Sequence, residues 1–306
     1  MKRALTLAAA LTVAACGGVQ TPSLGAPQQP TVAKIAGADF AWRTKALADD
    51  YFEGRGPGTA RGEAAADWIA DELKRVGLKP GVNGSYFQDV PAASIALDPA
   101  KSSFEIEGPD GAKALKFGDE VAFWTPRFDK GHQAVRDSEL VFVGYGVTAP
   151  EERWDDFKGV DVKGKTIVLF INDPGFITRD KRLFKGRAMT YYGRWTYKFE
   201  EAARRGAAAV IIVHETEPAA YGWQVVRNSN TGAKYYLDKA NGNADLVTVH
   251  SWVTTEVAKD LFARAGLDYA KLRLEANKRG FRAVPMKGLK LNAVTHSAVA
   301  RMNTRR

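Results

Sequence analysis

The sequence predicts a mixed α/β fold, and three observations in the middle of the chain support it. Residues 140–143 and 166–171 are apolar runs of strand length, and residues 208–213 form a third run. Between the second and third runs, apolar residues around Phe199 recur at helical spacing until Gly206 ends the pattern. A strand, a helix and a strand of these lengths form a crossover unit with two parallel strands.

The N-terminus has the features of a bacterial lipoprotein signal. A short basic start precedes an apolar run over residues 4–15, which is shorter than the roughly 20 residues needed to span a bilayer. Residues 13–17, Val-Ala-Ala-Cys-Gly, resemble a lipobox, in which Cys16 would be lipidated. Cys16 is the only cysteine, and this position favours lipidation over an ordinary secretory signal with an incidental cysteine. We expect residues 1–16 to be the signal peptide. The mature protein is then exported and anchored to a membrane through its lipid; Gly17 favours the outer membrane, facing the periplasm.

The remaining composition indicates how many domains the chain has and which classes of partner it could bind. Residues 17–35 are rich in Gly, Pro, Gln and Thr, so we expect a flexible tether. The remaining residues, roughly 270, suffice for one or two domains. The net charge is +9, and removal of Lys2 and Arg3 leaves 42 basic against 35 acidic residues, or +7. Because the basic residues are scattered, we expect no nucleic-acid partner.

The first folded element is predicted to be a helix that follows a glycine-rich loop. Thr59 is a suitable N-cap and Gly77 a suitable stop. The glycine spacing before the helix differs from a dinucleotide-binding fingerprint, and no buried strand precedes it. The apolar face is expected to consist of Ala66, Ile69, Leu73 and Val76.

This region carries a family resemblance. Residues 52–59, Phe-Glu-Gly-Arg-Gly-Pro-Gly-Thr, together with the helix and Gly-Leu-Lys-Pro at residues 77–80, resemble the start of bacterial aminopeptidases with two co-catalytic zinc ions. That group includes glutamate carboxypeptidase and the transferrin receptor. The resemblance covers most of residues 40–304 and implies an inserted protease-associated (PA) domain in the middle of the chain.

The resemblance also implies a division of the chain. Residues 36–95 would be the N-terminal helical segment of the peptidase domain, and residues 96–283 a PA-like β/α insert domain. Residues 284–306 alternate as a strand does and would be the first strand of an incomplete zinc-exopeptidase α/β catalytic domain. A strand without its sheet leaves backbone groups unpaired. We therefore expect residues 36–95 and 284–306 to be poorly supported in isolation, whereas the insert folds independently.

The sequence does not supply the chemistry of the resembled family. A two-zinc site needs histidine and carboxylate ligands and a glutamate base, and the family begins them with a His-x-Asp. None of the four histidines is followed two residues later by Asp. His214-Glu215 could begin a His-Glu-x-x-His helix, but Pro218 occupies the place of the second histidine. We expect no catalytic, cofactor-binding or metal residue in this chain, although a full-length relative would hold two zinc ions.

Three acidic pairs could be acid/base couples, but adjacent side chains point in different directions, so we expect solvated surface. These pairs are Glu151-Glu152, Asp155-Asp156 and Glu200-Glu201.

Three functions remain open at this point. The chain could be the N-terminal portion of a membrane-anchored zinc metallo-aminopeptidase, inactive alone, and this is the hypothesis we favour. It could instead be a non-catalytic lipoprotein whose PA domain binds peptides or other proteins. It could also be a subunit that a separately encoded catalytic half completes.

Overall fold

The computed structural model describes residues 36–81 and 83–306, so the predicted signal peptide, Cys16 and the tether lie outside the described residues. The chain divides into two compact units. Unit 1 consists of the described residues up to Val90 and Asn303–Arg306, and unit 2 is Pro91–Met302. Within the described residues, no helix is long and apolar enough to cross a membrane.

Unit 1 is built on two helices, α1 (Gly37–Leu47) and α2 (Ala60–Arg75), with a 3₁₀ turn at Asp50–Phe52 between them. The Thr59 hydroxyl accepts a hydrogen bond from the Gly62 amide, which confirms the predicted N-cap. Gly77 has a φ of 83°, the left-handed conformation that ends a helix.

The predicted apolar face of α2 is wrong. The buried positions are Ala65 and Ala70, whereas Ile69 is 44% exposed. The helix uses a neighbouring face because Trp68 packs against Trp42 of α1, with ring centroids 5.8 Å apart and the planes tilted by 40°. Aromatic packing between the two helices therefore decides which side of α2 turns inward.

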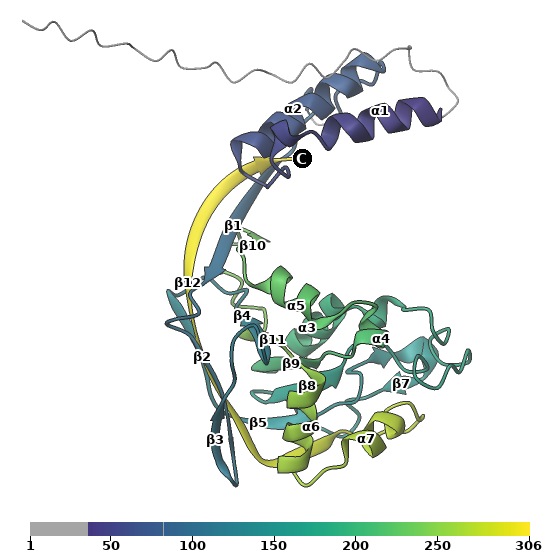
Figure 1. Cartoon of the computed structure of the whole chain (residues 1–306), viewed down its shortest axis with the longest axis vertical. Coiled ribbons are helices and arrows are strands. Elements are labelled where there is room, and N and C mark those ends of the chain that lie inside the picture. The colour runs from purple at the N-terminus through teal and green to yellow at the C-terminus, as the bar shows by residue number, and fades with distance from the viewer. Residues whose placement is uncertain (1–35, 82) are drawn as a thin grey trace, which may run out of the picture. The chain divides into compact units, whose positions relative to one another are not determined.

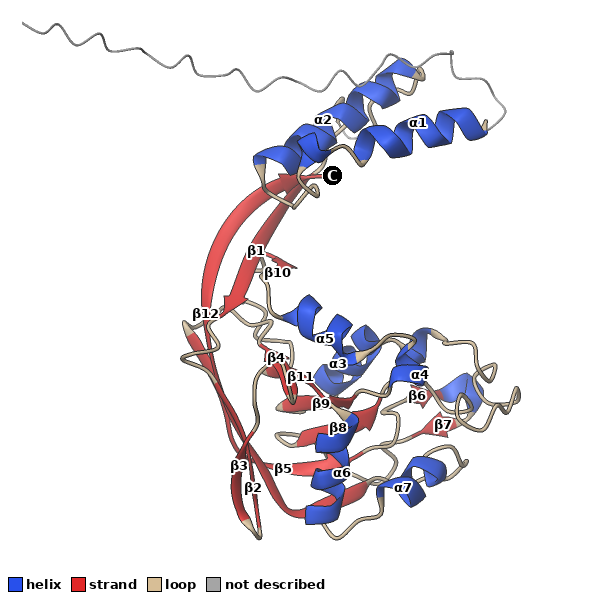
Figure 2. Cartoon of the chain, viewed as in Figure 1, coloured by secondary structure: helices blue, strands red, loops and turns tan. Residues whose placement is uncertain are grey.

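Unit 2 is organised around a large mixed sheet (Figures 1 and 2). The order of its main path is β10-β1-β12-β5-β8-β9-β11-β4, and a β2–β3 hairpin joins β12. A separate two-stranded hairpin consists of β6 (Thr148–Ala149) and β7 (Trp154–Asp155). The strands of the large sheet are β1 (Asp89–Leu97), β2 (Ser103–Gly108), β3 (Gly111–Ala114), β4 (Val121–Trp124), β5 (His132–Phe142), β8 (Thr166–Phe170), β9 (Ala209–Val213), β10 (Lys234–Leu237), β11 (Val249–Val253) and β12 (Val284–Arg305).

The centre of this sheet confirms the predicted α/β fold. β8 and β9 are parallel, and β5 and β11 extend the parallel set on either side. Both faces are covered, and β8 and β9 are accordingly buried at every position. Ile167 and Leu169 pack on one face with α3 (Trp195–Arg204) and α5 (Trp223–Asn230), and Val168 and Phe170 pack on the other with α6 (Thr255–Arg264). The remaining helices are α4 (Thr216–Ala219) and α7 (Tyr269–Glu275), with 3₁₀ turns at Pro150–Glu152 and Tyr191–Gly193.

The strand predicted for the C-terminal residues exists, but the expectation that it lacks partners is wrong. β12 pairs antiparallel with β5 on one side and with β2 on the other. Leu291 and Ala293 contribute to the core of unit 2. The partner that the sequence did not reveal is the long strand β5, which pairs with β12 from His132 to Phe142 with two register shifts.

Candidate aromatic cleft and the buried acidic groups

Two adjoining cavities of about 200 and 450 Å³ form an aromatic cleft in unit 2. They share Trp124, Trp195, Ser229 and Lys234. The side chains come from β4, α3, α5, β10 and β11, which are far apart in the sequence. The lining residues are Trp124, Trp195, Thr196, Phe199, Glu200, Tyr221, Val225, Val226, Ser229, Asn230, Ala233, Lys234, Tyr235, Tyr236, Leu246, His250 and Trp252.

The cleft lies between β10 and β4, the two end strands of the sheet order, which approach each other without pairing. The Trp124 indole of β4 donates a 3.0 Å hydrogen bond to the Tyr236 hydroxyl of β10. Trp195, Val225 and Tyr235 line the cleft and remain 41–46% exposed. Concave apolar surface with exposed large side chains is typical of ligand and peptide sites.

Two nitrogen-bearing side chains supply the polar character of the cleft. The His250 ring is 7% exposed, and within residues 36–81 and 83–306 its Nε2 has no hydrogen-bond partner. Burial lowers the pKa of His250 to about 3, helped by the positive charge of Lys234, so the ring is neutral at pH 7. Burial also lowers the pKa of Lys234 to about 8.

Lys234 has no acidic partner within the part of the chain that the structure describes. Its Nζ donates to the Ser229 carbonyl oxygen at 3.2 Å and lies 4.3 Å from the centroid of the Trp124 ring. Glu200 lines the cleft but is exposed and accepts a hydrogen bond from Tyr191. The cleft thus combines a neutral base with a half-buried cation.

The four histidines do not fit a two-zinc site. Within the described ranges, no three side chains of His, Cys, Asp or Glu are grouped to hold a metal ion. His214 Nε2 is 3.0 Å from the Tyr221 carbonyl oxygen, and His250 is buried in the cleft. His132 and His296 stack with centroids 5.5 Å apart, on strands that pair with each other.

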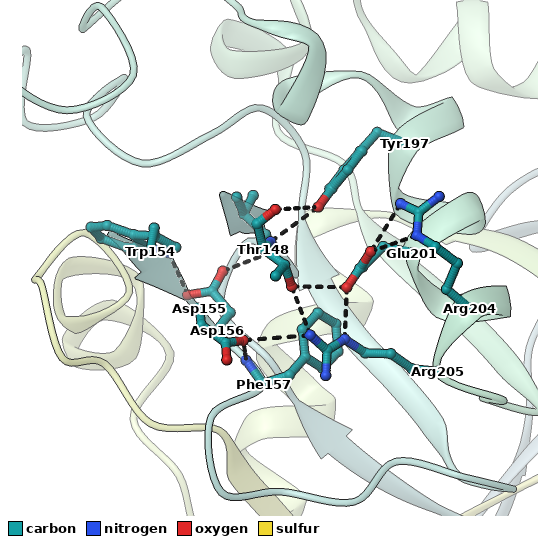
Figure 3. A network of polar contacts seen from close by, with 10 residues as sticks. Thr148, Trp154, Asp155, Asp156, Phe157, Tyr197, Glu201, Arg204 and Arg205 are labelled. Atoms are coloured by element: carbon teal, nitrogen blue, oxygen red, sulfur yellow. Dashed lines mark hydrogen bonds and ion pairs between the residues drawn. The ribbon is translucent and has the colours of Figure 1, made fainter. Parts of the chain in front are cut away.

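Two of the acidic pairs predicted to be solvated are partly buried, which corrects that expectation. Glu201 is 6% exposed and lies between Arg204 and Arg205 of the same helix (Figure 3). Its carboxylate also accepts a 2.8 Å hydrogen bond from the Thr148 hydroxyl. The arginines at positions i+3 and i+4 were a local signal for this contact that the sequence analysis missed. Glu200, by contrast, is exposed as expected.

Asp156 is the second correction. Its carboxylate accepts hydrogen bonds from the amides of Tyr145 and Val147 and from the Trp154 indole, at 2.7–3.2 Å. Burial raises its pKa to about 7. These bonds hold the β6–β7 hairpin in place, which is a structural role. Asp155 is exposed and pairs with Arg205 at 3.5 Å. The pair Glu151-Glu152 lies on the surface, where Glu151 accepts a hydrogen bond from Tyr192.

A buried cation completes this region. Lys198 of α3 donates to the carbonyl oxygens of Tyr145 and Asn172 at 2.5 and 2.9 Å. Burial lowers its pKa to about 7, against the opposing influence of the nearby Asp173 and Asp156 carboxyls. Through its bond to the Asn172 carbonyl oxygen, Lys198 therefore links the segment that follows β8 to α3.

Comparisons with known proteins give little further information. No protein-family model matches the chain, and no curated protein matches it. Among solved structures, the chain is similar to an aminopeptidase from Aneurinibacillus sp. strain AM-1, with 18% identity and a TM-score of 0.36. The similarity covers 81% of this chain and 42% of that chain, so the chain spans less than half of that structure. A likeness at this level carries no argument about function.

Proposed function

We propose that this chain is the peptide-binding, non-catalytic portion of an exported, lipid-anchored zinc aminopeptidase, with a PA-like domain in unit 2. The aromatic cleft carries the binding part of this proposal. It combines exposed apolar side chains with two nitrogen-bearing groups that lack acidic partners in the described chain. The family part rests on the sequence resemblance at residues 52–59 and 77–80.

Binding is tested by titrating the full chain with short peptides and following tryptophan fluorescence, since the cleft contains three tryptophans. A peptide with a phenylalanine side chain should bind at least tenfold more tightly than the same peptide with serine. Trp195→Ala and Val225→Ala should each weaken binding of the phenylalanine peptide severalfold. Leu274→Ala is the matched control, because Leu274 is exposed on α7 and does not line the cleft. Equal affinity for both peptides, or equal loss in the control, would contradict the proposal.

The alternative, a stand-alone binding lipoprotein, has one observation in its favour: the whole cleft lies within unit 2. The intact mass of the native protein, extracted from membranes, distinguishes the aminopeptidase proposal from the binding-lipoprotein proposal. A species much heavier than 33.3 kDa favours the zinc aminopeptidase. A mass matching residues 16–306 plus lipid favours the binding lipoprotein.

A further inference from the structure

Within the described chain, Lys234 has no acidic partner. Its charge is the feature that most restricts which ligands the cleft could bind. A half-buried ammonium group normally has a carboxylate partner, because burial without one is costly. Lys234 has a single carbonyl contact and the face of Trp124 instead. Its lowered pKa agrees with a site in which the counter-charge is missing.

The position of Lys234 adds a second constraint. Its side chain lines both cavities, so it lies where they join. The smaller cavity is walled by Trp252, Val226 and Tyr221, and suits an apolar ring. The larger cavity is lined by Phe199, Glu200 and His250, and the Nε2 atom of His250 is itself buried. A ligand that satisfies the cleft therefore needs an apolar ring and, next to it, an anionic group that accepts hydrogen bonds.

We infer that the aromatic cleft binds peptides that end in an aromatic residue, with the ring in the smaller cavity and the free C-terminal carboxylate beside Lys234. This inference rests on the proposed peptide-binding function and specifies which end of the peptide the cleft takes.

The experiment compares two forms of one peptide on the full chain: a hexapeptide ending in phenylalanine with a free carboxylate, and the same hexapeptide with a C-terminal amide. Isothermal titration should show at least tenfold tighter binding of the acid. Lys234→Met should abolish the preference, so that the acid and the amide bind this variant with the same affinity. Lys234→Arg should keep part of the preference, because the charge remains. Lys271→Met is the control, since Lys271 is exposed on α7 and outside the cleft.

The outcomes separate this inference from the proposed function. Equal affinity for acid and amide overturns the carboxylate inference and leaves peptide binding in place. Absence of binding by either form, in the wild-type chain, overturns both. Circular dichroism shows whether Lys234→Met folds. If it does not, the inference is tested by the acid–amide comparison in the wild-type protein and by Lys234→Arg.

Discussion

The imidazole of His250 lies flat against the ring of Phe199, with centroids 3.7 Å apart and planes 1° from parallel. His250 belongs to β11 and Phe199 to α3, so this stack joins the helix to the sheet at the floor of the cleft. In this face-to-face arrangement each ring covers one face of the other. The stack also holds His250 in the neutral form, because a protonated ring would be buried among apolar groups beside Lys234.

The first prediction concerns acid stability. The folded-state pKa of His250 is about 3, below the usual 6.5, so between these values the unfolded chain binds one more proton than the folded chain. Stability from this group therefore falls as pH falls from 6.5 to 3, by about 1.4 kcal/mol per pH unit. His250→Phe should lose less stability than the wild type between pH 7.5 and pH 4.5. Urea unfolding at the two pH values measures this, and identical losses would contradict the buried neutral histidine.

The second prediction concerns Glu201. Glu201→Gln removes the charge that Arg204 and Arg205 share and weakens the hydrogen bond to Thr148. Because both arginines are partly exposed, we expect a moderate loss of roughly 2 kcal/mol in the free energy of unfolding. The neighbouring variant Glu200→Gln is the control and should change stability by less than about 0.5 kcal/mol. Equal effects of the two substitutions would show that the Glu201 network is not a stabilising contact.

The third prediction concerns the coupling between Lys198 and Asp156. Lys198→Met leaves two carbonyl oxygens without their donor and a buried carboxyl without its cation, at a cost of about 3 kcal/mol. Asp156→Asn should be destabilising as well, since it removes acceptors from the hairpin. The double variant should lose less than the sum of the two, because it leaves no unpaired charge between them. A double-mutant cycle in urea measures the coupling, and strict additivity would mean that the charges do not interact.

The fourth prediction concerns Gly62 in α2. Alanine in a helix is normally more stable than glycine by about 1 kcal/mol. A Cβ at Gly62, however, would lie 2.1 Å from the Gly56 carbonyl oxygen, so Gly62→Ala must displace the loop that precedes the helix. We expect faster hydrogen exchange in the first turn of α2. Gly37→Ala in α1 meets open space and should be neutral or slightly stabilising. Slower exchange in Gly62→Ala would show that the loop yields freely.

Much of the fold could be predicted because its signals are local. The parallel strands at β8 and β9 are buried on both faces, so each reads as one apolar run, and α3 between them has a clear helical period. The cap at Thr59 and the stop at Gly77 likewise depend on neighbouring residues only. The face of α2 was mispredicted because Ile69 and Trp68 are equally apolar in sequence, and only the position of Trp42 decides between them.

The candidate site could not be predicted in the same way. The contact between Trp124 and Tyr236 joins residues 112 positions apart, and the missing partner of Lys234 is visible only once its neighbours are known. Burial of Asp156 also has no sequence signature, because its partners are two backbone amides and an indole. The sequence resemblance named a family, but it did not point to the cleft.

The way the chain passes between the two units has a practical consequence. It leaves unit 1 after Val90 and returns at Asn303, and both crossings fall within β1 and β12, which are neighbours in the sheet. Unit 2 is thus a continuous insertion whose two ends lie in adjacent strands. Both boundaries of unit 2 lie inside a strand, so an exchange or deletion of unit 2 would have to cut β1 and β12. Every residue that lines the aromatic cleft belongs to unit 2, so a substitution in the cleft leaves the sequence of unit 1 unchanged.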